Sequence, residues 1–431
     1  MKQPHIVIIG GGIAGTAAAH KLHVLGYQVT ILEKNNRLGG RIHSVKDGNF
    51  TFELGAGFMT DIYTNIFAFL KENRLANHIQ KRKSKSTIVK KNTFYSVSAK
   101  TLLGNKFLPF SAKIQLLPGF LKILSYWNSL DMHKLWQGEP YDKKTVSESF
   151  TGKNDKELVD YLLQPMLDGY CYWSADKTSE AMLLFILKFL VGGRYTYSLG
   201  LQSIPELLAK ECNVLFSQEV KSVQKNPDGT YKINTDKKTF VADGIVCATT
   251  ATAVLSIFKN LSVKQKDFFS NIRYSSTVVV AKTYKNISPS ANYAVAYPRK
   301  EGKNLGTITI VSDKATKTTL VKLFASGATG KKLCADSDAE IESLLTKDAM
   351  SAREFFDFSL PANEMYVRRW HEALPEFNVG HFDRIKKFKD GEIEIQDEKI
   401  VFAGDYIGGP FIEGAFTSGM WAAERLHTRL V

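Results

Sequence analysis

Three glycines and one carboxylate near the start of the chain have the spacing that binds a dinucleotide. Gly10, Gly12 and Gly15 form a GxGxxG pattern, and Glu33 follows at the end of the next apolar run. Gly10 permits a tight turn, Gly12 lets the backbone approach a pyrophosphate, and Gly15 lets a helix pack closely on a strand. A carboxylate at position 33 can accept hydrogen bonds from both ribose hydroxyls, and it disfavours the 2′-phosphate of NADP.

The elements around these residues are the ones that such a site needs. Residues 5–9 are a short β-branched run, typical of a strand that is buried on both faces. Residues 16–25 predict an alanine-rich helix that ends at Gly26, and residues 28–32 predict a second buried strand. The crossover between two such parallel strands is right-handed. The helix N-terminus then presents its free N–H groups to the phosphates.

This β-α-β unit suits NAD and FAD equally, so the segments after Glu33 decide between them. Gly39 and Gly40 stand between Arg37 and Arg41. Two adjacent glycines let the backbone approach a ligand, and the flanking arginines can neutralise pyrophosphate charge. Residues 52–58, FELGAGF, add a second glycine-lined segment.

Residues 10–15, 33, 37–41 and 53–57 together resemble the FAD-binding signature of the flavin amine oxidase superfamily. That superfamily includes monoamine oxidases, protoporphyrinogen oxidases and plant-type phytoene desaturases. The resemblance implies a Rossmann-like FAD-binding domain and a redox activity.

The likeness extends to the far end of the chain. Residues 220–223 with 242–250 are similar to the family's second FAD-contacting hairpin. Trp370 with residues 375–381 is similar to the segment beside the flavin. Residues 401–405 with 411–419 are similar to the C-terminal flavin motif. In such a motif Asp405 can bind the ribityl chain. The helix that starts near Glu413 directs its positive end at the flavin ring.

The resemblance therefore predicts FAD as the cofactor, held by residues from both ends of the chain. The expected cofactor-binding residues are Gly10, Gly12, Ile13, Ala14, Gly15, Glu33, Lys34, Arg37, Gly39, Gly40, Arg41, Gly55, Ala56, Gly57, Phe58, Val220, Thr249, Trp370, Gly404, Asp405, Ile412 and Ala415. Phe411 and His381 are the expected substrate-lining residues. The hydride acceptor is flavin N5 itself, and the sequence identifies no other catalytic group.

Three departures from the family bear on the reaction. No cysteine follows Cys334, so the FAD is expected to be non-covalent, unlike that of covalent monoamine oxidases. Many amine oxidases carry a lysine near flavin N5, whereas residues 275–280 have valine at the matching position. One of the two tyrosines that sandwich an amine is replaced by Phe411. These departures disfavour simple amine oxidation.

Residues 164–170, 200–205 and 375–381 instead resemble the protoporphyrinogen oxidase branch. The predicted function is oxidation of a large, mainly apolar or tetrapyrrole-like small molecule, with hydride transfer from a C–H or C–N carbon and reoxidation by O₂ or another acceptor. Amine oxidation and carotenoid-type desaturation are alternatives on the same fold. A lipid- or prenyl-binding escort protein without catalysis is the alternative of another class.

The expected fold class is α/β, with a Rossmann-like FAD domain of the glutathione reductase 2 type and an interleaved α+β substrate domain. The FAD domain is predicted to be discontinuous, from residues 1–57, 200–273 and 390–431. The substrate domain is predicted to combine a helical part, residues 58–199, with an antiparallel sheet, residues 274–389.

Composition restricts the partners. The 431 residues carry a formal charge of +14, and 44% are hydrophobic, which is ordinary globular composition. The four cysteines form no CxxC pair, so neither a disulfide scaffold nor a metal site is expected. No signal or spanning segment is visible, which predicts a cytoplasmic protein. Nucleic acid is not an expected partner, because no recognition module accompanies the charge.

A basic stretch, residues 71–113, overlaps a very apolar one, residues 107–136. Three interpretations stay open for this region. It can form a helical core with a solvated basic face, line a cavity for a large flat or polyene substrate, or bind peripherally to an anionic membrane.

Overall fold

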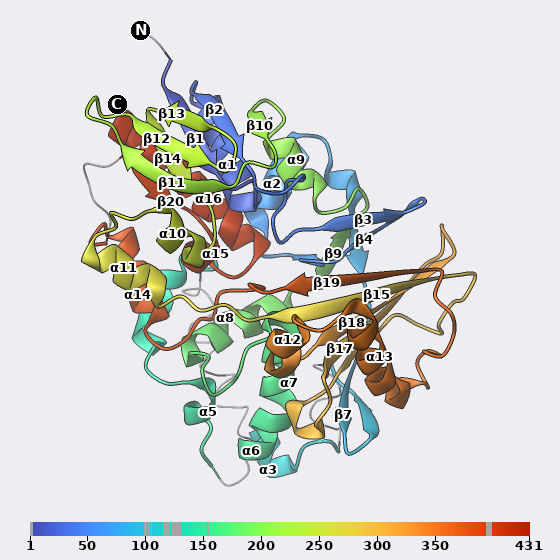
Figure 1. Ribbon diagram of the computed structural model, residues 1–431. Helices are drawn as coiled ribbons and strands as arrows, with labels where there is room; N and C mark the ends of the chain where they lie inside the picture. Colours follow the sequence, from blue (N-terminus) through green and yellow to red (C-terminus); the bar gives the residue numbers. More distant parts are fainter. Residues whose placement is uncertain are drawn as a thin grey trace.

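The computed structural model describes residues 3–98, 101, 104, 106–114, 121, 131–152, 155–393 and 399–431. It confirms the predicted α/β fold class (Figure 1). No helix among these residues is long and apolar enough to cross a membrane.

A parallel five-stranded sheet gathers strands from three distant parts of the chain. Its strand order is β10 (Asn213–Leu215), β2 (Gln28–Leu32), β1 (His5–Ile9), β14 (Gly244–Cys247) and β20 (Ile400–Phe402). Every neighbouring pair is parallel. The β-branched runs that predicted β1 and β2 are buried here on both faces.

Helices cover one face of this sheet and a small antiparallel sheet covers the other. The covering elements are α1 (Ile13–Val24), α9 (Ser203–Leu208) and α16 (Ile412–Leu430) on one face, and β11 (Val220–Lys225), β12 (Tyr231–Thr235), β13 (Thr239–Ala242), α10 (Ala251–Ile257) and α11 (Val263–Ser270) on the other. Glycines set how closely the layers approach. A Cβ at Gly15 would lie 1.9 Å from the Gly10 carbonyl oxygen, and one at Gly419 would lie 2.0 Å from that of Ala14.

A seven-stranded mixed sheet forms the second half of the molecule. Its order is β19 (Glu364–Trp370), β15 (Thr277–Lys285), β18 (Thr318–Ala325), β17 (Leu305–Asp313), β16 (Tyr293–Ala296), β7 (Lys85–Lys90) and β8 (Thr93–Ser96). The sequence predicted an antiparallel sheet from residues 274–389 alone. The structure differs, because β7 and β8 extend it from the segment expected to be helical, and β7 runs parallel to β16.

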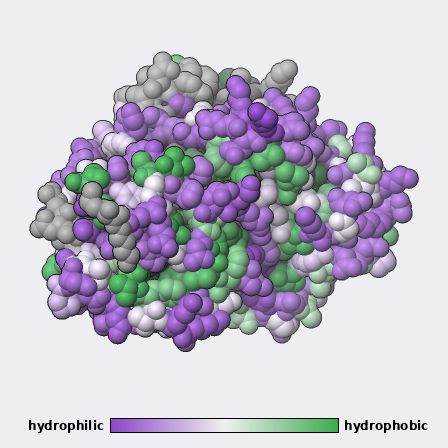
Figure 2. All heavy atoms as spheres, turned by 90° about the horizontal axis from the view of Figure 1, so that it is seen from above, coloured by the Kyte–Doolittle hydropathy of each residue, from purple (hydrophilic) through white to green (hydrophobic). Residues whose placement is uncertain are grey.

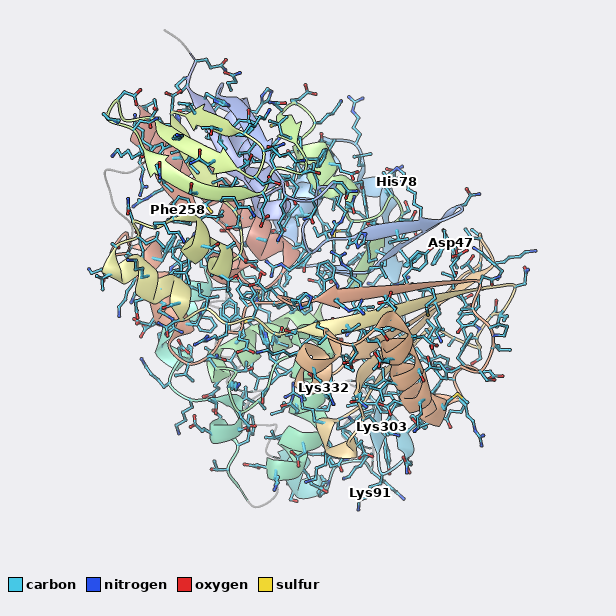
Figure 3. All side chains as sticks on the ribbon, in the orientation of Figure 1. Asp47, His78, Lys91, Phe258, Lys303 and Lys332 are labelled. Carbon is cyan, nitrogen blue, oxygen red and sulfur yellow. The ribbon has the colours of Figure 1, made fainter. Side chains whose placement is uncertain are left out.

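The two faces of this sheet have different neighbours. On one face α12 (Gly327–Leu333) and α13 (Asp338–Ala349) bury the apolar side chains of alternate strand positions, such as Ile308 and Ile310. On the other face lie α7 (Gln164–Cys171) and α8 (Glu180–Val191). In Figure 3, Lys91 and Lys303 mark the end of the molecule farthest from the five-stranded sheet, while Phe258 lies close to that sheet.

The remaining elements connect these layers. They are β3 (Ser44–Asp47), β4 (Phe50–Glu53), β5 (Met59–Thr60), α2 (Thr64–Glu72), η1 (Ala76–His78), β6 (Ile79–Arg82), α3 (Phe110–Ile114), η2 (Leu135–Tyr141), α5 (Val146–Ser149), α6 (Asp155–Leu158), η3 (Val159–Leu163), β9 (Arg194–Tyr197), η4 (Arg299–Glu301), η5 (Met350–Ala352), α14 (His381–Lys389) and α15 (Asp405–Gly408). A π-helical turn, η3, joins α6 to α7. Residues 115–120 and 122–130 of the apolar stretch 107–136 lie outside the described residues.

Figure 2 shows one face of the molecule, seen from above. Hydrophilic side chains dominate its outer parts, and hydrophobic side chains gather near its centre. The apolar groups on this face are therefore concentrated rather than evenly spread.

Candidate active site

A single cavity of about 1250 Å³ runs from the five-stranded sheet to the seven-stranded sheet. It begins where β1 and β2 end, at Ile9 and Leu32, and continues to β17 and β18. Open α/β sheets bind ligands at the carboxyl ends of their strands. We call the part beside β1 and β2 the nucleotide end, and the part between α7, α8 and the large sheet the slot.

The glycine-rich turn lies at the nucleotide end. Gly10, Gly12, Ile13 and Ala14 line the cavity. Gly10 has φ +103°, and a Cβ there would lie 2.8 Å from the Ala248 carbonyl oxygen. The first turn of α1 has neither a side-chain cap nor an acidic residue, so its amides stay available to an anion.

The Glu33 carboxylate is buried and held by its own chain. It accepts hydrogen bonds from the Gly11 backbone N–H at 2.8 Å, and from the backbone and side-chain nitrogens of Asn35 at 2.8 and 2.6 Å. These contacts fix the orientation of the carboxylate at the cavity wall, beside Lys34. The geometry suits a ribose diol and opposes a 2′-phosphate.

Two arginines shape the loop that follows. The Arg37 guanidinium donates to the carbonyls of Leu38, Gly40 and Ile42. Arg41 makes a two-pronged ion pair with Asp405, with both N···O distances 2.8 Å. Both arginines line the cavity. Because their guanidinium groups already bind carbonyls and a carboxylate of the protein, their main role is to fix the shape of the loop at the cavity wall.

The second glycine segment lies against Trp370. A Cβ at Gly55 would lie 2.0 Å from the Arg41 carbonyl oxygen and 3.1 Å from Trp370 Cζ2. The Trp370 indole N–H donates to the Leu54 carbonyl oxygen at 3.0 Å. Gly55, Ala56, Gly57 and Phe58 therefore present a backbone surface to the cavity, with no room for larger side chains at Gly55.

The C-terminal helix α16 also starts at the cavity, through Ile412 and Ala415. Its Glu413 carboxylate turns away and accepts bonds from the first amides of α2, Asn65 N–H at 2.7 Å and Ile66 N–H at 3.1 Å. Because the Glu413 side chain caps α2 instead, the N-terminal end of α16 faces the cavity without a capping side chain. Its dipole can stabilise negative charge there.

Most of the sequence-predicted residues meet at this cavity. Those that line it are Gly10, Gly12, Ile13, Ala14, Glu33, Lys34, Arg37, Gly39, Gly40, Arg41, Gly55, Ala56, Gly57, Phe58, Val220, Thr249, Trp370, Gly404, Asp405, Phe411, Ile412 and Ala415. Gly15 is not among the lining residues and acts through the close packing of α1 on β1.

The expectation for His381 needs correction. This residue is completely buried at the start of α14 and is not among the lining residues. Its Nε2 lies 3.0 Å from the Tyr406 carbonyl oxygen, and its ring contacts Phe377. Burial lowers the pKa of His381 to about 3, so the imidazole is neutral at pH 7 and serves packing.

Phe411 lies where the nucleotide end meets the slot. Its ring stacks on Phe189 with centroids 4.7 Å apart, and Phe58 and Tyr170 complete an aromatic cluster. Aromatic rings at this junction give an apolar boundary between the two parts of the cavity.

The slot has two unlike walls. The helical wall is apolar, and its lining includes Leu162, Met166, Leu183, Leu184 and Leu187. The sheet wall consists of two rows of register partners, Lys322–Thr309–Ala294–Ser86 and Phe324–Thr307–Ala296–Ile88. Threonine and alanine occupy the middle of both rows, so the central part of the sheet wall is flat, while the larger Lys322, Phe324 and Ile88 stand at its ends.

Lys322 is a cavity residue that the sequence did not predict. The resemblance places the family's lysine on the strand that is β15 here, where valine stands, whereas Lys322 lies on the neighbouring β18, directly opposite Ala281. Its Nζ lies at the cavity and donates to the Glu53 carbonyl oxygen at 3.1 Å. Burial, with the nearby charge of Arg82, lowers the pKa of Lys322 to about 8. The sequence feature that could have indicated this residue is a lysine within the strand-like run TTLVKLFA.

The shape of the nucleotide end fits a flavin dinucleotide. A Cβ at Gly12 would meet nothing within 4 Å, so this glycine leaves open space at the cavity; the α1 amides are free, and Glu33 is oriented. The cavity then continues past Trp370 and Asp405 toward the start of α16. A nicotinamide dinucleotide has no requirement for that C-terminal contribution.

Comparison with known proteins agrees with this geometry. Residues 13–427 match the family of flavin-containing amine oxidoreductases. A mitochondrial protoporphyrinogen oxidase of Nicotiana tabacum is 22% identical, over 97% of this chain and 94% of its own length. Polyamine oxidase 2 of Arabidopsis thaliana is 22% identical, over 100% of this chain and 89% of its own.

The fold has solved counterparts. Cyclohexylamine oxidase from Brevibacterium oxydans IH-35A superposes with a TM-score of 0.78 at 17% identity, over the full length of both chains. A family match that spans nearly the whole sequence carries the assignment: the chain belongs to the family of flavin-containing amine oxidoreductases, and it is an oxidoreductase with a flavin cofactor.

Proposed function

We propose that this chain binds FAD non-covalently and oxidises a large, flat or elongated, mainly apolar small molecule. The observation that carries the proposal is the continuity of one cavity. The residues suited to a dinucleotide and a slot with an apolar helical wall line the same cavity.

The chain's own residues bind and orient rather than react. Glu33 and the α1 amides suit the ribose and phosphates, while Arg41 holds Asp405 at the cavity wall. The aromatic cluster at Phe411 and the leucines of α8 exclude water from the slot. When bound, the flavin supplies a two-electron acceptor that takes a hydride at N5 from a substrate carbon and passes the electrons to O₂ or another acceptor.

Non-covalent binding is consistent with the cysteines. Cys171 lines the cavity, and burial raises the pKa of its thiol well above the usual range. The thiol therefore stays protonated and is a weak nucleophile. No cysteine follows Cys334, so none lies near the start of α16 in sequence.

The test begins with the purified protein. Equimolar FAD that is released into the supernatant by acid precipitation supports non-covalent binding. Anaerobic mixing with a porphyrinogen, a polyamine and a carotenoid precursor then identifies the substrate class by which compound bleaches the flavin. A colourless protein that takes up no FAD on reconstitution contradicts the proposal and favours the escort alternative.

Attachment to an anionic membrane is a separate proposal. Phe110 and Ile114 on α3, and Leu121 nearby in sequence, are exposed, and they lie in or beside the basic stretch 71–113. Such a combination suits a headgroup surface. Co-sedimentation with anionic vesicles at low salt is the expected result, and failure to sediment there contradicts it.

A further inference from the structure

The slot contains three cationic side chains at one end. Arg82 on β6, Arg194 on β9 and Lys322 on β18 all line it. Arg82 and Arg194 are direct register partners on neighbouring antiparallel strands. Like charges placed opposite each other destabilise a sheet, so this arrangement needs a compensating role.

The immediate surroundings of these cations within the described part of the chain are neutral rather than acidic. Among the described residues, none of the three forms an ion pair with Asp or Glu within 4.0 Å. Arg194 donates to the Tyr170 hydroxyl and lies over the Tyr170 ring. Lys322 donates to a backbone carbonyl. The charges of Asp313 and Glu53 act on Arg82 without an ion pair, and the Glu53 carboxylate is already bound by the Ser44 hydroxyl and the Leu201 N–H.

Polar groups of the sheet wall surround the same end. Thr309 lies directly opposite Lys322, and Ser86 belongs to the same row. The hydroxyl oxygens of Thr309 and Thr307 are buried without a hydrogen-bond partner among the described residues. Burying an unpaired charge or hydroxyl costs free energy unless a ligand satisfies it.

We propose that Arg82, Lys322 and Arg194 form a carboxylate-binding site, so that the substrate is an apolar molecule with an acidic group. The apolar body lies between the leucines of α8 and the flat sheet wall, and the carboxylate lies against β6, β9 and β18. This inference rests on the proposed function, since it names the substrate class of the same cavity.

Two of the alternative substrates fit this arrangement poorly. The cations repel the ammonium group of an amine. A pure hydrocarbon such as a polyene leaves all three cations desolvated and unpaired, which is costly. On the slot side, Glu180 is the one acidic side chain among the described lining residues.

The experiment is a binding titration of the FAD-loaded protein with three fluorescent probes that share the pyrene ring and a four-carbon side chain. These are 1-pyrenebutyrate, its methyl ester and 1-pyrenebutylamine. The expected result is that the carboxylate binds at least about tenfold more tightly than the ester or the amine, because only the carboxylate can accept charge-assisted hydrogen bonds from the three cations. Equal affinities for all three probes, or preference for the amine, overturn the proposal.

Variants locate the effect. Arg82→Gln and Lys322→Met are each expected to lower carboxylate affinity by about tenfold and leave ester affinity unchanged. Arg82→Lys should restore part of the loss. Lys83→Gln is the matched control, because Lys83 is the exposed neighbour of Arg82 and is absent from the cavity lining. A loss in the control equal to that in Arg82→Gln contradicts the site.

Flavin content and thermal stability are measured on every variant, so that a folding defect is recognised independently. Loss of FAD from the wild type contradicts the proposed function. Full FAD content without carboxylate preference contradicts only the carboxylate site. Because Arg82→Gln and Lys322→Met each remove one of the neighbouring positive charges, the thermal stability of these variants should stay unchanged or rise.

Discussion

The nucleotide end and the slot handle charge in opposite ways. At the nucleotide end Arg41 is paired with Asp405, and the Glu33 carboxylate is held by three N–H groups. In the slot Arg82, Arg194 and Lys322 have no ionic partner among the described residues. A site for a resident cofactor is satisfied by its own protein, whereas a site for a transient ligand leaves its charges for that ligand.

Asp405→Ala should have the largest effect. It removes the partner of Arg41 and leaves a poorly solvated guanidinium, which costs about 3–5 kcal/mol where an ion pair is fully buried. Because Arg41 is partly exposed, we expect about 3 kcal/mol in the free energy of unfolding, measured by denaturant titration of the FAD-free protein. Asp405→Asn is the control, with a smaller loss. A change below about 1 kcal/mol, the usual value of exposed pairs, shows that this end is not internally balanced.

Lys322→Met tests the unpaired charge of the slot through the pH dependence of the free energy of unfolding. The pKa of Lys322 is lowered from 10.5 to about 8 in the folded chain, so between these values the unfolded chain binds more protons. Wild-type stability should therefore rise relative to the variant as pH increases from 8 to 10.5, by roughly 3 kcal/mol at most. Below pH 8 the difference should be constant. A difference that does not change with pH contradicts the buried-lysine assignment.

Glu33→Ala should weaken FAD retention and also lower the free energy of unfolding, because the N–H groups of Gly11 and Asn35 lose their acceptor. The change removes charge-assisted bonds to ribose, each worth about 1.5–3 kcal/mol, so the dissociation constant of FAD should rise by at least about tenfold. The measurement is flavin occupancy after dialysis. Glu33→Gln keeps an acceptor and should lose less. Unchanged occupancy in Glu33→Ala removes this residue from the cofactor site.

Gly169→Ala should have the smallest effect and should be confined to the slot. A Cβ at Gly169 would lie 3.0 Å from Thr307 Oγ1, so the added methyl group would narrow the slot between α7 and β17. We expect a few-fold loss in 1-pyrenebutyrate affinity with unchanged FAD content. Gly229→Ala is not a suitable control despite its open surroundings, because its φ is +83°. Gly104, which has open surroundings and no positive φ, is suitable.

The nucleotide end was predictable because its function depends on backbone and local spacing. Gly10, Gly12 and Glu33 lie within one β-α-β unit, whose pattern is readable in a single stretch of sequence. The contribution of Asp405 and Ile412 came from resemblance to the family. Their approach to β1 depends on long-range packing of α16 on α1, which Gly419 permits.

The slot was not predictable because it depends on strand register between distant segments. Arg82 and Arg194 become partners through the pairing of β6 with β9, and β7 joins β16 in parallel. A basic stretch in the sequence gives no sign that Arg82 turns inward while Lys83 stays exposed. The prediction for His381 was wrong for a related reason. This residue lies in a segment that resembles the one beside the flavin, but its side chain is buried away from the cavity.

If the flavin and the substrate share one cavity, a ligand bound in the slot should change the environment of the flavin ring. The most direct measurement is the visible flavin spectrum of the anaerobic holoprotein during titration with 1-pyrenebutyrate. Our account predicts a perturbed flavin band that saturates at the same concentration as probe fluorescence. A protein that binds the probe while its flavin band stays unchanged would show that the two sites are separate.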